Sequence, residues 1–460
     1  MRTLLLTTLL TGLMLPVSAH AENPHKEFIS GPINNGSDAT AQCIECHEEH
    51  TDAFMKTSHW TWAKEQTVNG KTVKLGKKNA INNYCVSVSS NEPRCTKCHA
   101  GYGYEDATFD FSDATRVDCL VCHDTTGTYQ KDLSGYAFKG ANLLKIAQNV
   151  GAPVRDNCGS CHFYGGGGDG VKHGDMDSSM AYPDKALDVH MDADGMDFQC
   201  QDCHKGESHT IQGQAMSVSP GSTDHMECSS CHDNTVHSNA KLNRHTEKVA
   251  CQTCHIPEFA KVEPTKLWWD WSEAGQERQE VKNQWGRKDY MKKKGSFQWG
   301  QKVQPEYAWY NGTAEAYLFG DTMDPATITA LSKPAGAKDD GKSKIYPFKV
   351  HRGKQLYDAK HKVFIPTKVF GKDGYWKTFD WDKSATAGMN THPAMQAKGL
   401  TYSGQKGFAE TEMWWRINHM VSPKEQALGC MDCHGKKGRL DWKQLGYDLD
   451  PMKAANKKKQ

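Results

Sequence analysis

The sequence predicts a mainly α-helical fold, built from short helices and loops, with a helical C-terminal half and little β-structure. Two observations lead to this expectation. Cysteine and histidine recur together eight times as Cys-x-x-Cys-His, seven times before residue 256, in segments whose Gly, Asp, Asn and Ser favour short helices joined by loops. The cysteine-free stretch 256–429 holds ten of the 13 tryptophans and long charged runs poor in glycine, and it favours helices.

The eight motifs indicate covalently bound haem. Two thiols at this spacing can bond both vinyl groups of one haem, and the histidine that follows lies beneath the iron as an axial ligand. This composition gives only about 0.03 such matches by chance, and a zinc site does not explain the histidine eight times over. The cysteines are Cys43, Cys46, Cys95, Cys98, Cys119, Cys122, Cys158, Cys161, Cys200, Cys203, Cys228, Cys231, Cys251, Cys254, Cys430 and Cys433. The proximal histidines are His47, His99, His123, His162, His204, His232, His255 and His434.

The expected fold class is therefore a mainly α multihaem cytochrome c with eight haem c groups. Only Cys85 remains outside the motifs, which excludes a disulfide scaffold. Hydrophobic residues make up 37% of the chain and the mean hydropathy is −0.73, which is low for a chain with a large core. Eight porphyrins would supply the missing apolar volume.

The N-terminus has the parts of a secretory signal peptide. Arg2 precedes an apolar run from Leu4 to Val17 and the small-residue pattern Ala19-His20-Ala21. We expect residues 1–21 to be removed and the mature chain to be periplasmic, where covalent haem attachment takes place. No later segment is long enough to span a membrane, so the protein is not expected to be membrane-embedded.

The mature chain divides into two expected regions. Residues 22–255 carry haems 1 to 7, and residues 256–460 form a mainly helical region that carries haem 8. Helices are expected near 272–295 and 405–421. The run 362–370 could pair with a neighbouring strand, although Pro366 argues against a central position.

Charge gives little indication of a macromolecular partner. The formal net charge of +1 does not favour nucleic acid or an anionic membrane. The run 191–197 offers closely spaced carboxylates, so calcium is conceivable, but it lacks a full EF-hand ligand set and a solvated acidic turn explains it better.

Neutral imidazoles are the natural sixth ligands of electron-transfer haems. Thirteen histidines remain after the eight proximal ones and His20 are subtracted from the 22 in the chain. Their positions relative to the motifs favour seven as distal ligands, namely His59, His190, His209, His237, His245, His351 and His419. His392 and His225 compete with His351, and no role is given to His25, His50, His173 and His361.

A cytochrome in which every iron has two strong ligands only transfers electrons, whereas catalysis needs one iron with a displaceable ligand. Multihaem nitrite reductases mark that haem by a lysine in place of the motif histidine, and no Cys-x-x-Cys-Lys occurs here. A catalytic haem must therefore be distinguished on its distal side.

Three long segments resemble the octahaem c-type cytochromes of the tetrathionate reductase family. They are 158–177, 249–275 and 417–442, and they span much of the mature chain. The family is itself similar to pentahaem nitrite reductases and hydroxylamine oxidoreductases in the way its haems pack. The resemblance implies that the second haem, bound by Cys95, Cys98 and His99, is catalytic.

The resemblance also implies three site residues: Lys172 as the distal ligand of that haem, with Asp169 and Cys85 beside it. The residues are chemically suited to these roles. Four consecutive glycines before Asp169 let the backbone approach a haem, and the carboxylate could orient the lysine amine. The amine must be neutral to bind iron, so burial would have to lower its pKa. Cys85 could exchange with a sulfur substrate or be an inert packed thiol.

The expected function is that of a periplasmic reductase. A donor c-type cytochrome or a quinol-linked donor would supply electrons, and a small anionic substrate would be reduced at the lysine-ligated haem. Tetrathionate would be cleaved to thiosulfate, and nitrite and hydroxylamine are alternative substrates. The rival interpretation is a non-catalytic electron-transfer conduit with two strong ligands on every iron, since thirteen spare histidines suffice for it.

Overall fold

The structure is a computed structural model, and it describes residues 24–213, 226–233 and 235–457. The expected signal peptide and His225 lie outside the described residues. Within these ranges, no helix is both long enough and apolar enough to cross a bilayer.

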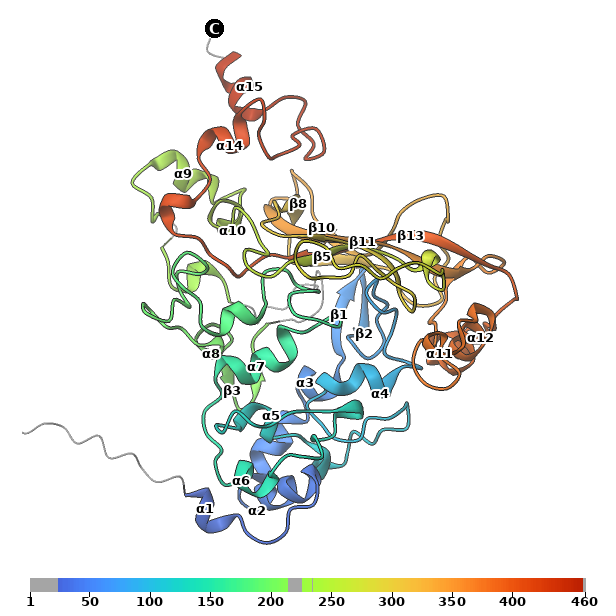
Figure 1. The fold of residues 1–460 in the computed structure, drawn as a ribbon. Coiled ribbons are helices and arrows are strands. Elements are labelled where there is room, and N and C mark those ends of the chain that lie inside the picture. Colours follow the sequence, from blue (N-terminus) through green and yellow to red (C-terminus); the bar gives the residue numbers. More distant parts are fainter. Residues whose placement is uncertain (1–23, 214–225, 234, 458–460) are drawn as a thin grey trace, which may run out of the picture.

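Seven of the eight Cys-x-x-Cys-His motifs lie on short helical segments, as the sequence predicts, and the first lies within the 19-residue helix α2. These segments follow one side of the molecule, from α2 at the bottom of Figure 1 to α14 at the top. In chain order they are α2 (Gly36–Phe54), α4 (Glu92–Cys95) with η1 (Thr96–Cys98), α5 (Leu120–His123), α7 (Arg155–His162), α8 (Cys200–Cys203), η5 (Cys228–Ser230), α10 (Cys251–His255) and α14 (Cys430–His434).

Other short helices lie between and beyond the motifs. They are α1 (His25–Phe28), α3 (Ser58–Thr61), η2 (Ala114–Arg116), η3 (Leu133–Gly135), α6 (Leu143–Ala147), η4 (Ser178–Ala181), α9 (Ala240–His245), η6 (Trp271–Glu273), α11 (Tyr375–Thr378), α12 (Trp381–Thr391), α13 (Pro393–Ala397), η7 (Lys424–Gln426) and α15 (Pro451–Lys457).

The expectation of a mainly α fold with little β-structure is wrong. A mixed sheet of eleven strands, nine of them from the C-terminal half, has the order β2-β1-β9-β10-β13-β11-β5-β7-β6, with β8 and β12 also paired to β11. Its strands are β1 (Lys64–Val68), β2 (Lys71–Leu75), β5 (Thr265–Asp270), β6 (Tyr290–Met291), β7 (Gly295–Gly300), β8 (Glu306–Tyr310), β9 (Thr313–Ala316), β10 (Thr329–Ala335), β11 (Lys344–Asp358), β12 (Val363–Phe364) and β13 (Lys406–Arg416). A separate hairpin joins β3 (Gly206–Glu207) to β4 (Thr210–Ile211).

The helix expected near 405–421 is strand β13. Ala409, Thr411, Met413 and Trp415 are all buried, and they alternate along the strand with more exposed residues such as Glu410. This period of two is the pattern of a strand with one buried face, and the aromatic residues favour a pleated surface. Charged residues in the run 406–416 obscure this alternation in the sequence.

The expectation of a helix near 272–295 is also wrong. After η6, the chain passes through loop and returns as the β6–β7 hairpin. The turn ends at Gly295, whose φ is +86°, and a Cβ there would lie 1.9 Å from the Asp270 carbonyl oxygen. Only glycine permits that backbone approach. In contrast, the run 362–370 pairs as expected, through the short strand β12, and Pro366 lies beyond its end.

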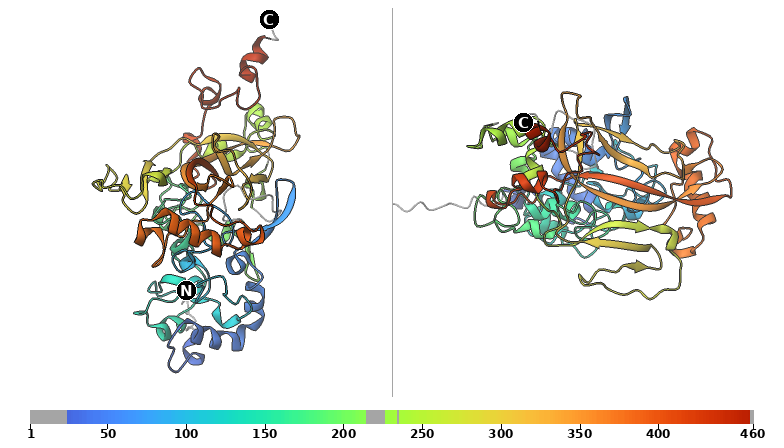
Figure 2. Two further views of the ribbon diagram at one scale, coloured as in Figure 1. Left: turned by 90° about the vertical axis from the view of Figure 1, so that its right-hand side faces the viewer. Right: turned by 90° about the horizontal axis from the view of Figure 1, so that it is seen from above.

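One face of the sheet packs both against helices α11 and α12 and against Val171 of the glycine-rich segment 163–177. Seen from above, the orange and red C-terminal strands extend away from the motif helices (Figure 2, right). Helices α11 and α12 lie below the right-hand end of the sheet in Figure 1, away from α8 and α10. The hairpin β1–β2 comes from the N-terminal half and joins this sheet, because Val68 pairs with Ala314 of β9. The expected regions 22–255 and 256–460 are therefore joined through a common sheet.

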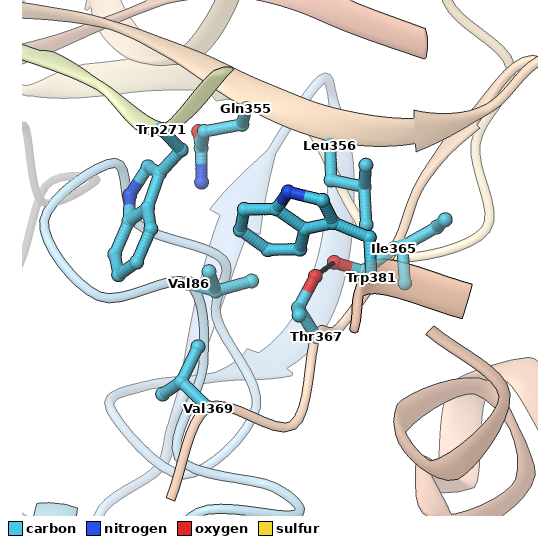
Figure 3. Close-up of a pocket in the computed structure, with 8 residues that line it drawn as sticks. All are labelled: Val86, Trp271, Gln355, Leu356, Ile365, Thr367, Val369 and Trp381. Carbon is cyan, nitrogen blue, oxygen red and sulfur yellow. Dashed lines mark hydrogen bonds between the residues drawn. The ribbon is translucent and has the colours of Figure 1, made fainter. Parts of the chain in front are cut away.

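A small cavity lies between β11 and α12 (Figure 3). Its lining includes Val86, Trp271, Val369 and Trp381, and none of its eight lining residues is charged. An apolar cavity of this kind does not suit an anion, so the candidate site has to be sought where charged groups meet.

Candidate functional site

Seven of the eight motif histidines face a second histidine ring at nearly the same distance. The ring centroids are 6.1 to 6.3 Å apart. Two imidazoles that bind one metal at about 2 Å each, from opposite sides, have centroids roughly 6.2 Å apart. The pairs are His47–His25, His123–His209, His162–His59, His204–His419, His232–His190, His255–His237 and His434–His245.

Hydrogen bonds hold several of these rings by one nitrogen. The Nδ1 of His123 donates to the Gly151 carbonyl at 2.8 Å, and the Nδ1 of His434 donates to Asp450 at 2.7 Å. Such a bond fixes the tautomer and leaves Nε2 free to bind a metal. Together with the paired thiols of every motif, this donor set fits haem c.

The structure differs from the sequence-based expectation at one distal position. His25, to which the sequence analysis gives no role, faces His47, whereas His351 faces no motif histidine among the described residues. His351 instead stacks on Tyr84 at 3.9 Å, and its Nδ1 hydrogen-bonds Asn83 at 2.8 Å. The reason is that α1, which precedes the first motif, folds back so that its His25 faces His47. Sequence spacing does not reveal such a fold-back.

His50 also lies near His47, with ring centroids 5.7 Å apart, but it belongs to the same helix. That helix is kinked at His47, and the 5.7 Å separation of His47 and His50 is shorter than the 6.1 to 6.3 Å that the seven facing pairs share. His25 therefore has the better geometry.

His99 is the exception among the motif histidines. It is completely buried, and its ring neighbours are aromatic and contain no histidine among the described residues. They are Trp60, Trp62, Tyr104, Phe109 and Phe111. The second haem site therefore differs from the other seven in having no second imidazole.

Lys172 lies beside this exceptional site. Its amino group is within electrostatic range of the Cys85, Cys95 and Cys98 thiols and lies 4.8 Å from the centroid of the Trp415 ring. Burial, reinforced by the charge of Lys77, lowers the pKa of Lys172 to about 7. An amine with this pKa is substantially neutral near pH 7, which is the form that can bind a metal.

The glycine run lets the chain fold tightly around this lysine. A Cβ at Gly165 would lie 3.3 Å from the Cδ of Lys172. Gly166 has a φ of +79°, and a Cβ there would lie 3.2 Å from the Cβ of Lys172. Larger residues would push the lysine away from its position.

Cys85 lies on a strained turn. The side chain of Asn82 accepts hydrogen bonds from the backbone N–H groups of Tyr84 and Cys85, at 3.0 and 2.9 Å. Val86 follows with a φ of +104°, which is rare for a β-branched residue. Backbone strain of this kind concentrates at functional sites, because the surrounding structure has to maintain it.

Asp169 is not in contact with Lys172. Its carboxylate accepts hydrogen bonds from the backbone N–H of Ser178 at 2.8 Å and from the Ser178 hydroxyl. The carboxylate therefore anchors the far end of the glycine-rich segment, and it does not orient the amine directly.

A search of the solved structures gives a close relative. The octaheme cytochrome c from Shewanella oneidensis is 62% identical to this chain, with a TM-score of 0.90, over 94% of this chain and 98% of that chain. The chain belongs to the octahaem c-type cytochromes. Family models for bacterial cytochrome c and for cytochrome c554 and c-prime match residues 266–437 and 42–124. An uncharacterized protein of Archaeoglobus fulgidus is 26% identical over 36% of this chain and 73% of its own length.

Membership of this family gives the chain covalently bound haem c and a role in multihaem electron transfer. Contacts between motif cysteines show how the sites of this octahaem cytochrome follow one another. Cysteine sulfurs of neighbouring motifs lie side by side in the pairs Cys43–Cys119, Cys98–Cys161, Cys158–Cys200 and Cys228–Cys251. Others lie within electrostatic range in the pairs Cys122–Cys158, Cys203–Cys231 and Cys254–Cys433.

These contacts arrange seven motifs in a line and one as a branch. The line runs through motifs 1, 3, 4, 5, 6, 7 and 8, and motif 2 joins it at motif 4 through the Cys98–Cys161 contact. Cys46 at one end of the line and Cys430 at the other are exposed, and so are Cys231 and Cys251 of the sixth and seventh motifs. The site without a second imidazole is therefore a side branch.

The acidic run 191–197 does not form a calcium site in the structure. Asp197 pairs with Arg155 at 2.7 Å, and within the described ranges no group of three or more metal-ligating side chains could hold an ion. The carboxylates belong to a turn in which the backbone N–H groups of Gly195 and Asp197 donate to the Asp192 carbonyl.

The distal ligand of the first haem can be tested directly. We expect His25→Ala to leave one haem with a single imidazole, so that a high-spin signal appears in the oxidised holoprotein and added imidazole removes it. We expect His351→Ala to leave the spectrum of low-spin haem unchanged. Electron paramagnetic resonance of both variants checks this, and the opposite result would restore His351 as the ligand.

Proposed function

We propose that this octahaem cytochrome is a periplasmic reductase with eight haem c groups, in which Lys172 is the displaceable sixth ligand of the haem bound by Cys95, Cys98 and His99. The observation that carries the proposal is the exception at His99: seven motif histidines face a second imidazole, and the eighth has a lysine nearby. When bound, the haems supply iron centres that each accept and pass on one electron. The donor is a c-type cytochrome or a quinol-linked protein.

Charge around the site favours a small anionic substrate. Lys266 and Lys349 are buried near Lys172 and Cys85, and none of these three lysines forms an ion pair within the described part of the chain. The amino group of Lys266 lies 3.8 Å from the centroid of Trp269 and 3.5 Å from that of Phe297. Burial lowers the pKa of Lys172 and of Lys266, and an incoming anion would favour the protonated form of both amines.

The substrate that best fits these groups is tetrathionate. Two electrons cleave its central S–S bond and give two thiosulfates, with no net uptake of protons. Cys85 supplies a sulfur atom that could exchange with that bond, and the freed amine of Lys172 could hold the departing anion. Nitrite and hydroxylamine are secondary substrates, because both are small enough to approach the same site.

The line of seven motifs supports a second candidate function. Exposed cysteines lie at both of its ends and in its sixth and seventh motifs, so a protein docked at any of these places could exchange electrons with the line and bypass the branch. In this alternative the protein is a conduit between two redox partners, and the branch carries no chemistry.

Steady-state turnover distinguishes the two functions. With reduced viologen as the donor, we expect the purified holoprotein to be reoxidised catalytically by tetrathionate, and more slowly by nitrite or hydroxylamine. Ferricyanide accepts electrons from any exposed haem, so reoxidation by ferricyanide is the control that electrons still pass along the line of motifs. Rapid reoxidation by ferricyanide with no turnover on the three substrates would reject the reductase and leave the conduit.

A further inference from the structure

Lys349 is a completely buried lysine at the centre of the sheet. It lies on β11, where it pairs with Trp415 of β13, and its side chain passes toward the segment that carries Lys172. Its amino group donates to the carbonyl oxygens of Val171 and Lys172, at 2.9 and 2.8 Å, and to the hydroxyl of Thr265. Burial lowers the pKa of Lys349, whereas the three acceptors favour its ammonium form, which has three N–H groups to donate.

Other groups hold the same stretch of backbone. The Thr265 hydroxyl donates to the Gly170 carbonyl at 2.7 Å, and the Tyr84 hydroxyl donates to the Lys172 carbonyl at 2.8 Å. The carbonyls of residues 170, 171 and 172 thus all accept bonds from side chains outside the segment. A Cβ at Gly174 would lie 3.1 Å from the Cδ of Lys349, so the backbone there rests directly on the lysine.

The segment cannot hold Lys172 in place by itself. Between α7 and η4 it contains no helix or strand, and six of its residues are glycine. Glycine-rich backbone has many accessible conformations, whereas a ligand weaker than imidazole has to be presented to its metal with little loss of freedom. The rigid element in contact with it is the sheet, through Lys349 and Thr265.

We propose that Lys349 is a positioning residue that clamps the backbone at Val171 and Lys172 and so presents the Lys172 amine to the second haem site. The clamp rests on the proposed function, because it has a purpose only if Lys172 is a ligand. A buried lysine is costly in a sheet, and a structural role alone could be filled by an apolar side chain.

The test uses oxidised holoprotein and added imidazole as the probe. In Lys349→Met and in Thr265→Val, we expect imidazole to replace the ligand of one haem in eight with an apparent affinity about 10- to 100-fold higher than in the wild type. Near-infrared magnetic circular dichroism, which separates lysine–histidine from bis-histidine haem, reports the exchange, and the seven other haems are internal standards. Thr411→Val is the matched control, because Thr411 is equally buried on β13 and bonds Gln355 at 3.0 Å, away from the segment.

Each outcome decides the question. If Lys172→Met removes the lysine–histidine signal but Lys349→Met and Thr265→Val exchange like the wild type, the clamp is wrong and the proposed ligand stands. If Lys172→Met leaves the spectrum unchanged, the proposed ligand fails and the clamp fails with it. If Thr411→Val exchanges as readily as Thr265→Val, or if all eight haems change together, the effect is general loosening of the fold and the clamp is rejected. Thr265→Val keeps the test available if Lys349→Met does not fold.

Discussion

In the Lys172→Ala variant, one reduced haem in eight is expected to bind carbon monoxide without having to displace a protein ligand. The reason is the exception at His99, which has no second imidazole among the described residues and would be left five-coordinate. Turnover of tetrathionate is expected to fall about 10- to 100-fold, because a charge-assisted hydrogen bond to the anion is lost. Carbon monoxide difference spectra and the viologen assay measure the two effects.

A matched control is available in the same haem motif. Lys97→Ala removes a lysine that acts electrostatically on Cys98 but is exposed. This variant should bind carbon monoxide as the wild type does. If Lys172→Ala and Lys97→Ala bind carbon monoxide alike, Lys172 is not a ligand of the haem iron.

Loss of the fourth haem is expected to have the largest effect on activity. Cys161 contacts Cys98 of the second motif, and Cys158 contacts Cys200 of the fifth, so this motif joins the branch to the line. Replacing Cys158 and Cys161 by alanine should lower tetrathionate turnover by orders of magnitude, while a donor still reduces the remaining haems. Stopped-flow absorbance follows the reduction, and mass spectrometry verifies the haem count.

The same replacement at the end of the line is the control. Cys430 and Cys433 belong to the terminal eighth motif, in which Cys433 lies near Cys254 of the seventh. Without the eighth haem, electrons should still enter through the rest of the line and turnover should persist. Equal losses in the two variants would contradict the branched arrangement.

The sequence predicts the haem sites well because their chemistry is local. A Cys-x-x-Cys-His run specifies its own haem wherever it lies in the fold. Distal ligands are harder to predict, because each comes from a distant part of the chain. Spacing pointed to His59 and His419, which face His162 and His204, but it missed His25, which reaches His47 only because α1 turns back on α2.

The fold of the C-terminal half was predicted wrongly for a physical reason. Charged runs poor in glycine favour helices, but aromatic side chains also favour strands, and the alternating burial of Thr411, Met413 and Trp415 has a period of two. The run 406–416 forms a strand because it pairs with β11, which is distant in the sequence. The clamp at Lys349 was unpredictable in the same way, because it joins residues 177 positions apart.

The central claim is that one iron in the octet carries an amine while its seven neighbours carry two imidazoles. Near-infrared magnetic circular dichroism of the oxidised wild-type holoprotein tests it most directly. We expect two bands, one from lysine–histidine haem and one from bis-histidine haem, with intensities in the ratio one to seven. A single bis-histidine band accounting for all eight haems would contradict the account.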